Sequence, residues 1–292
     1  MNNKRLRANF LLLLTAAIWG FAFTAQRVGS QYVGAFTFNG IRFALGSISL
    51  IPLIIYFNKK NKSNNTKQSA KNTILPGILV GALLFSGSTL QQIGLIYTTA
   101  GKASFLTGLY IVLVPVIGIF MKHKIGKSAW AGVFLAVIGL YLLSINENFT
   151  IAFGDMLQII GAFFWAFHIL TIDYFTKKVD SLKLSFVQFA TCSILSLICA
   201  LIFEKITISG IVSAGIPILY GGLLSVGVAY TLQVVAQKYA KPSTAAIILS
   251  MESVFGAIGG AVILGETMNT RGYIGCIFIL AGILVSQITV KS

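Results

Sequence analysis

Charged residues are scarce in this chain. They make up 10% of its 292 residues, and only 7 residues are acidic, whereas 56% are hydrophobic. Soluble domains carry about 25% charged residues. A water-soluble globule could not bury so much apolar surface, so the composition excludes that class and predicts a membrane protein.

Cysteines and catalytic motifs are also few. The three cysteines, Cys192, Cys199 and Cys276, all lie within apolar runs. Cys192 and Cys199 are about 10 Å apart along one expected helix, too far for a disulfide. A zinc site needs denser Cys and His spacing, so we expect the cysteines to pack and no metal to bind. The chain has no nucleotide-binding loop, HExxH or GxSxG motif, and we expect no cofactor and no enzymatic activity.

Basic residues are in excess, and the formal net charge is +15. In a soluble protein this charge would suggest nucleic acid as the partner. Here most lysines and arginines fall in short segments between apolar runs, as expected where the partner is a lipid bilayer and not a nucleic acid. An apolar run of about 20 residues follows Lys4, Arg5 and Arg7. The run is longer than the apolar core of a signal peptide and lacks a cleavage site, so we interpret it as the first span.

Apolar runs of about 20 residues predict ten transmembrane helices. If the N-terminus is cytoplasmic, 17 of the 22 basic residues fall in inside segments and only Arg27, Lys102, Lys205 and Arg271 fall outside or at outer span edges. This asymmetry follows the positive-inside rule and predicts a multi-pass protein of the cell inner membrane with both termini cytoplasmic. The predicted spans are 9–28, 36–57, 74–97, 102–121, 127–145, 155–176, 183–203, 214–237, 243–264 and 271–290.

The two halves of the chain resemble each other weakly. Trp19 matches Trp165 at an offset of 146, and Gln91 matches Gln233 at an offset of 142. These matches predict a first five-helix repeat over 1–146 and a second over 147–292. Because five crossings end on the opposite side of the membrane from where they begin, the second repeat should be inverted. Inverted repeats are typical of secondary transporters, which bind substrate near the midplane between the repeats.

Several motifs resemble the EamA type of the drug/metabolite transporter superfamily. They are AAIWGFAF, IRFALG, LQQIGLIYTTAGKASFLTGLYIVLVPV and YAKPSTAAIILSMESVFGAIGGAVILGETMNTRGYIGCIFILAGI. The resemblance implies an all-α bundle of ten helices that works by alternating access around a cavity lined by spans 1, 3, 4, 6, 8 and 9. Relatives of this type export amino acids, purines, toxic cations or other metabolites, and some import sugars. One departure is Ser253, where such proteins often have proline, so a kink there is in doubt.

Ionisable residues inside the bilayer are costly and need a reason. Glu252, near the middle of span 9, could carry a coupling proton or face a cation, or it could form a structural hydrogen bond. His168, three residues after Trp165, could relay protons or bind substrate, or it could be a satisfied polar contact. Arg42 could attract an anion or snorkel to the interface, and a structural role is favoured because span 2 should be peripheral. Asp173, near the inner end of span 6, should reach cytoplasmic water or a lysine such as Lys177 at the i,i+4 position.

Neutral polar and aromatic residues complete the candidate site. Gln91 and Gln233 should lie on opposite walls of the cavity because the repeat relates them. An aromatic lining could hold a ring or an ammonium group, although Tyr230 in particular could be a packing or belt residue. The sequence thus predicts outward carriage of a small-molecule substrate, an amino acid or related amine, with a passive channel, a lipid-handling protein or an intramembrane enzyme as alternatives. The predicted substrate-binding residues are Trp19, Gln91, Tyr110, Trp165, His168, Tyr230, Gln233 and Glu252.

Overall fold

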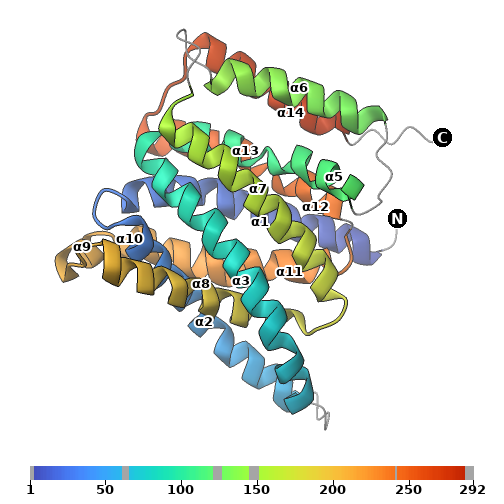
Figure 1. The fold of residues 1–292 in the computed structure, drawn as a ribbon, viewed down its shortest axis with the longest axis vertical. Helices are drawn as coiled ribbons and strands as arrows, with labels where there is room; N and C mark the ends of the chain where they lie inside the picture. Colours follow the sequence, from blue (N-terminus) through green and yellow to red (C-terminus); the bar gives the residue numbers. More distant parts are fainter. Residues whose placement is uncertain (1–2, 61–65, 121–126, 145–150, 241, 287–292) are drawn as a thin grey trace.

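A computed structural model describes residues 3–60, 66–120, 127–144, 151–240 and 242–286, and the elements within these ranges are all helices (Figure 1). The first half contains α1 (Asn3–Gly29), α2 (Ala35–Lys60), α3 (Thr66–Tyr97), α4 (Ala100–Thr107), α5 (Tyr110–Phe120) and α6 (Lys127–Ser144). The second half contains α7 (Phe153–Thr176), α8 (Ser181–Phe203), α9 (Ile208–Ser213), α10 (Gly215–Leu219), the π-helix η1 (Tyr220–Tyr230), α11 (Thr231–Gln237), α12 (Pro242–Leu249), α13 (Glu252–Leu264) and α14 (Thr270–Ser286).

Seven helical stretches among the described residues are long and apolar enough to cross a bilayer. The predicted spans 127–145, 243–264 and 271–290 correspond instead to the shorter apolar helices Trp130–Leu143, Glu252–Leu264 and Thr270–Gly282. The chain is therefore a multi-pass membrane protein whose described residues form helices and no sheet. The count of ten crossings stays a prediction. The seven stretches are Lys4–Gly29, Ala35–Lys59, Asn72–Tyr97, Ala100–Gly118, Phe153–Thr176, Ser181–Phe203 and Gly215–Gln237.

Two predicted spans are interrupted at matching places. The span 102–121 is divided between α4 and α5 at Gly108, and the span 243–264 is divided between α12 and α13 at Ser250. At each break the chain tightens into i→i+3 hydrogen bonds, from Ile111 N to Gly108 O at 3.1 Å and from Ser253 N to Ser250 O at 3.0 Å. Such tight turns within a helix often mark functional hinges. The interruption near Glu252 thus exists without a proline at position 253.

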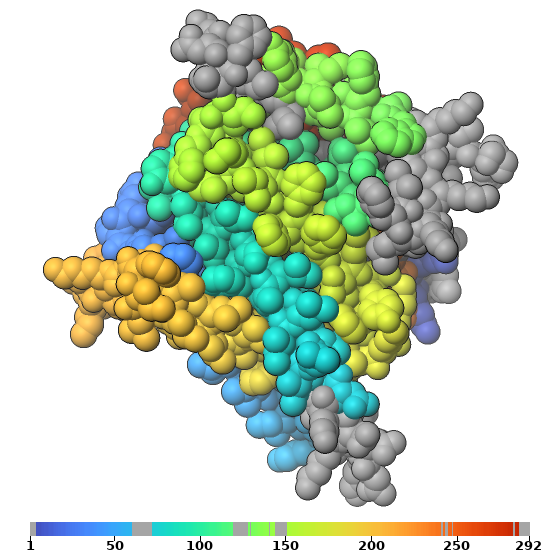
Figure 2. Space-filling model, in the orientation of Figure 1, coloured from blue at the N-terminus to red at the C-terminus, as the bar shows by residue number. Residues whose placement is uncertain are grey.

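The outer faces of the helices are apolar. On α7, Met156, Ile160, Phe163 and Phe167 are each more than 40% exposed and recur every three or four residues. This spacing places them on one helix face. In Figure 2 the side chains of α3, α7 and α8 form a continuous surface on this side of the molecule. A stripe of this kind is suited to lipid, and the opposite face of α7 is buried against the other helices.

Helices from the two halves pack in pairs. α2 packs on α8, α4 on α13 and α6 on α14, and Figure 1 shows the last pair along one edge of the molecule. α6 and α14 approach closely at Gly139 and Gly275, where a Cβ on either glycine would lie within 3.0 Å of the carbonyl oxygen of the other. Small residues allow such backbone approach in membrane bundles. These contacts join helices that are distant in sequence.

Candidate functional site

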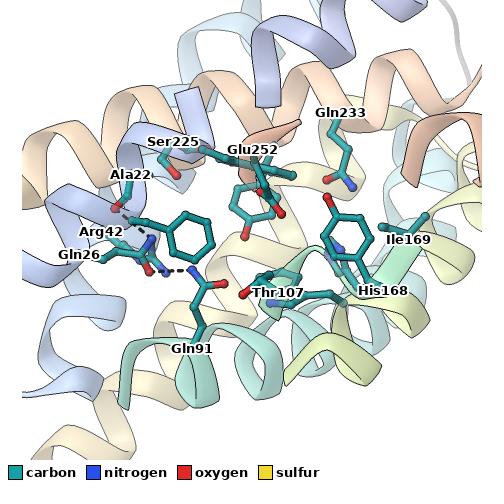
Figure 3. Close-up of a pocket in the computed structure, with 15 residues that line it drawn as sticks. Ala22, Gln26, Arg42, Gln91, Thr107, His168, Ile169, Ser225, Gln233 and Glu252 are labelled. Atoms are coloured by element: carbon teal, nitrogen blue, oxygen red, sulfur yellow. Dashed lines mark hydrogen bonds between the residues drawn. The ribbon is translucent and has the colours of Figure 1, made fainter. Parts of the chain in front are cut away.

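A cavity lies at the centre of the bundle, and the empty space in it and at its mouth amounts to about 430 Å³ (Figure 3). Spans 1, 3, 4, 6, 8 and 9 all contribute, as the family resemblance implies, and α2 also contributes through Arg42. The lining comprises all eight residues that the sequence analysis selected, together with Ala22, Phe23, Gln26, Arg42, Thr107, Ile169 and Ser225.

Tyr230 is at the centre of an aromatic cluster in the cavity wall. Its ring centroid is 4.4 Å from that of Trp19, 6.3 Å from that of Trp165 and 6.1 Å from that of His168. Tyr230 is only 5% exposed and is the last residue of η1. Tyr230 therefore packs inside the bundle and lines the cavity, and it does not belong to an interfacial belt.

Glu252 enters the cavity from the first residue of α13. It is 3% exposed, and its Oε1 has no hydrogen-bond partner among the described residues. The Tyr110 hydroxyl, from the first residue of α5, is also buried and interacts with the Glu252 carboxyl. Both residues follow the helix interruptions described above, and both line the cavity. The interruptions thus set an acid and a phenol side by side on the cavity wall.

His168 and Gln233 add further unpaired polar atoms. His168 Nε2 is 3.0 Å from Gln188 Oε1, while its Nδ1 has no partner in the described part of the chain. Gln233 Oε1 and Trp165 Nε1 are also buried, and neither has a hydrogen-bond partner among the described residues. Buried polar groups are normally satisfied, so these three atoms on the cavity wall can each accept or donate a further hydrogen bond to a ligand or water, while other unpaired buried atoms lie away from the cavity.

Gln91 differs from Gln233 because its amide is already engaged. Its Nε2 donates to Gln26 Oε1 at 3.0 Å, and Gln26 Nε2 in turn donates to the carbonyl oxygen of Ala22 at 3.2 Å. In Figure 3, Gln91 and Gln233 lie at opposite sides of the drawn group. This arrangement agrees with the opposite walls that the repeat predicted. Gln26 was not selected from the sequence, although it lies one helical turn after Ala22 on the face that carries Trp19.

The position of Arg42 differs from the sequence expectation. It lines the cavity at 2% exposure, so it neither snorkels to the interface nor belongs to a peripheral helix. Its Nε donates to Asn39 Oδ1 at 3.0 Å, and its guanidinium lies 4.8 Å from the ring centroid of Phe43 and 5.5 Å from that of Phe38. Span 2 reaches the centre because α2 lies between α8 and η1. The position of Arg42 within span 2 could not predict that α2 packs against both α8 and η1.

The remaining ionic groups lie outside the cavity lining. Lys177 Nζ is 2.8 Å from Asp173 Oδ2, which confirms the predicted i,i+4 pair. Asp155, which the sequence analysis did not select, is fully buried, pairs with Lys102 and accepts a hydrogen bond from the Thr98 hydroxyl at 2.9 Å. Neither aspartate lines the cavity. The ionisable residues that line the cavity are Glu252, Arg42, His168 and the two tyrosines.

Comparison with known proteins gives consistent similarities over nearly the whole chain. The sequence model of the EamA-like transporter family matches residues 6–145 and again residues 152–287. An uncharacterized transporter of Archaeoglobus fulgidus is 31% identical over 98% of this chain and 88% of its own length. The uncharacterized transporter YoaV of Bacillus subtilis is 22% identical over 95% of this chain and 96% of its own. A solved crystal structure superposes with a TM-score of 0.71 at 17% identity over 96% of both chains, a likeness that shows the fold alone.

Proposed function

This chain belongs to the EamA-like transporter family, and we propose that it is a secondary transporter that moves an amino acid or a related amphipathic amine outward across the inner membrane. The observation that carries the proposal is the cavity, where an acid, amides and aromatic rings converge and where His168 Nδ1, Gln233 Oε1 and Trp165 Nε1 have no partner among the described residues. An ammonium group could sit by the Glu252 carboxyl or over a ring face, and an apolar side chain could pack among Trp19, Trp165 and Tyr230.

The proposed mechanism is alternating access between two inverted repeats, 1–146 and 147–292. Two features support it. One family description fits each half of the chain separately, and helices at corresponding places in the two halves pack against each other. The helix interruptions at Gly108 and Ser250, which the offset of 142 also relates, would serve as hinges beside the substrate.

The helix ends on the predicted outer side are tied together. The Glu204 carboxylate accepts hydrogen bonds from Phe36 N and Thr37 N, both at 2.8 Å, at the start of α2. The Glu266 carboxylate accepts from Ala100 N at 2.8 Å and Gly101 N at 3.0 Å at the start of α4. Carboxylates at helix N-termini are stabilised by the helix dipole. In the proposed cycle these contacts hold the outer side closed and break when it opens.

Counterflow with purified protein in liposomes tests the function. Saturable exchange of labelled neutral amino acids is expected, and it should weaken in folded Gln91→Ala and Trp165→Ala variants. Nucleobases, sugars and quaternary amines belong in the same panel. Exchange of sugars alone, or amino-acid exchange that both substitutions leave unchanged, would contradict the substrate assignment.

The alternatives give different results in the same experiment. Unsaturated flux would mean a passive channel, lipid movement without solute exchange a lipid-handling protein, and formation of a product an enzyme. For an intramembrane enzyme, His168 and Glu252 share the cavity, but Asp173 is outside its lining and is paired with Lys177. The family and the names of the relatives indicate transport.

A further inference from the structure

We propose that Arg42 binds the carboxylate of the transported molecule, so that Arg42 and Glu252 together select a zwitterion over a simple amine. This inference rests on the proposed transport function and adds to it the residue that recognises the anionic group. The sequence left open that Arg42 attracts an anion but favoured a structural role. The argument rests on its incomplete bonding, its fixed orientation and the separation of the two opposite charges.

The guanidinium of Arg42 has unused hydrogen-bonding capacity. Arginine offers five N–H donors, and among the described residues only Nε is engaged, by Asn39 Oδ1 at 3.0 Å. No carboxylate in the described part of the chain forms an ion pair with it. The ring faces of Phe38 and Phe43 offset part of the charge. They cannot replace an acceptor for the two terminal nitrogens, which form the planar fork that matches a carboxylate.

Asn39 fixes the direction of that fork. Its Nδ2 donates to the backbone carbonyl oxygen of Ser88 on α3 at 3.1 Å, while its Oδ1 accepts from Arg42 Nε. Asn39 is fully buried, one helical turn before Arg42 on α2. Asn39 is thus fixed by its hydrogen bond to Ser88, and it in turn fixes the orientation of the guanidinium through Nε. A residue that only needed solvation would not require this support, whereas a pre-oriented binding group does.

The cavity separates its two opposite charges. In the view of Figure 3, Arg42 lies with Gln26 and Gln91 at one side, and Glu252 lies between this group and the side that carries Gln233 and His168. Arg42 and Glu252 do not form an ion pair with each other. A simple amine would satisfy Glu252 and leave a buried cation without an anion, and a simple acid would do the reverse. A zwitterion satisfies both.

Four ligands that differ in one charged group test the proposal. They are leucine, its decarboxylated amine 3-methylbutylamine, its deaminated acid 4-methylpentanoate and its amide leucinamide. Affinity is measured by the quenching of the fluorescence of the cavity tryptophans and by competition in leucine counterflow. Wild-type protein should bind leucine about 10- to 100-fold more tightly than the amine or the amide, the range expected for one charge-assisted hydrogen-bonded contact.

The variants then assign that preference to a residue. Arg42→Gln should bring the leucine-to-amine ratio close to one, and Arg42→Lys should keep part of it. Glu252→Gln should instead relax discrimination against 4-methylpentanoate. Arg27→Gln is the matched control, because the Arg27 guanidinium is already bound to the carbonyl oxygens of Leu95 and Ile96 at the end of α3 and lies outside the cavity lining. Its ligand ratios should equal those of the wild type.

The outcomes separate this inference from the proposed function. Saturable leucine counterflow by a wild-type protein that binds the amine equally well would overturn the role of Arg42 and leave transport intact. A wild-type preference that persists in folded Arg42→Gln would do the same. Absence of saturable exchange with any ligand would remove the transport proposal itself. If Arg42→Gln does not fold, the wild-type ratio and the Arg42→Lys variant still decide the question.

Discussion

Ser104 and Ser253 are joined by two hydrogen bonds that run in opposite directions. The Ser253 hydroxyl donates to the carbonyl oxygen of Ser104 at 2.9 Å, and the Ser104 hydroxyl shares its proton between the carbonyl oxygens of Gly101 at 2.7 Å and Ser253 at 3.2 Å. Both residues are fully buried, one on α4 and one directly after the start of α13. The serine that departs from the family pattern therefore ties the two interrupted spans together beside Glu252.

Ser253→Ala should lower the free energy of unfolding by about 0.5 to 1.5 kcal/mol, because it removes one of these buried bonds. Ser253→Pro, which restores the residue common in the family, should lose the same donor. Unfolding of the purified protein in mixed micelles by increasing denaturing detergent measures the change. Ser213→Ala, at the end of the exposed α9, is the control and should leave stability near that of the wild type. Equal stability of all three variants would show that the reciprocal bonds contribute nothing.

Gly20→Ala should destabilise the protein by about 1 to 3 kcal/mol through overpacking. A Cβ at this position would lie 2.8 Å from both the Glu252 carbonyl oxygen and the Gly256 backbone nitrogen, so backbone would have to move. Gly215→Ala is the matched control, because no atom lies within 4 Å of a Cβ there. The same unfolding assay compares the two. A Gly20→Ala protein as stable as Gly215→Ala would mean that α1 and α13 are less closely packed than described.

Glu252→Gln should uncouple transport from a pH gradient. If the carboxyl carries the coupling proton, the amide variant still exchanges substrate between two filled sides but no longer accumulates it when a gradient is imposed. Asp173→Asn is the control, because Asp173 pairs with Lys177 outside the cavity lining. Gradient-driven uptake and exchange are measured in the same liposomes. Full gradient-driven transport by folded Glu252→Gln would leave Glu252 with a structural or ligand-binding role only.

Glu204→Gln should make the cavity more accessible from the predicted outer side, because it weakens the bonds to Phe36 N and Thr37 N. A cysteine at Thr107 in a cysteine-free background reports access to an impermeant thiol reagent added outside. Asp180→Asn is the matched control, since the Asp180 carboxylate caps α8 through Lys183 N at 2.9 Å on the predicted inner side. Labelling that rises equally in both variants, or in neither, would argue against an outer closure at Glu204.

The topology can be tested with single cysteines at two exposed positions. A cysteine at Gln31, between α1 and α2, should react only with reagent added outside, and one at Lys178, between α7 and α8, only with reagent added to the cytoplasmic side. Residues 61–66 should likewise react only from the cytoplasm and residues 147–150 only from outside, and all of them except residue 66 lie outside the described residues. The opposite pattern at either position would break the ten-span topology and, with it, the inverted repeat.

The sequence by itself predicted a helical membrane transporter, and the eight site residues that it selected all line the cavity. Scarce charge and long apolar runs leave no other way to satisfy the backbone than helices in lipid. Polar residues within such runs are costly, so they mark the interior, and that reasoning selected Glu252, His168, Gln91 and Gln233 before their contacts were known. The matching offsets in the two halves also placed Gln91 and Gln233 on opposite walls.

Only the tertiary structure decided which face of each span turns inward and where a span is interrupted. Arg42 lines the cavity because α2 is inserted between α8 and η1, and Asn39 and Ser88 then orient its guanidinium. The turn before Glu252 forms without proline, because contacts between α4 and α13 hold it. In a chain that is apolar on nearly all sides, the hydrophobic pattern gives little information on helix rotation. Close packing at glycines and a few buried hydrogen bonds set the rotation, and these depend on residues far apart in the sequence.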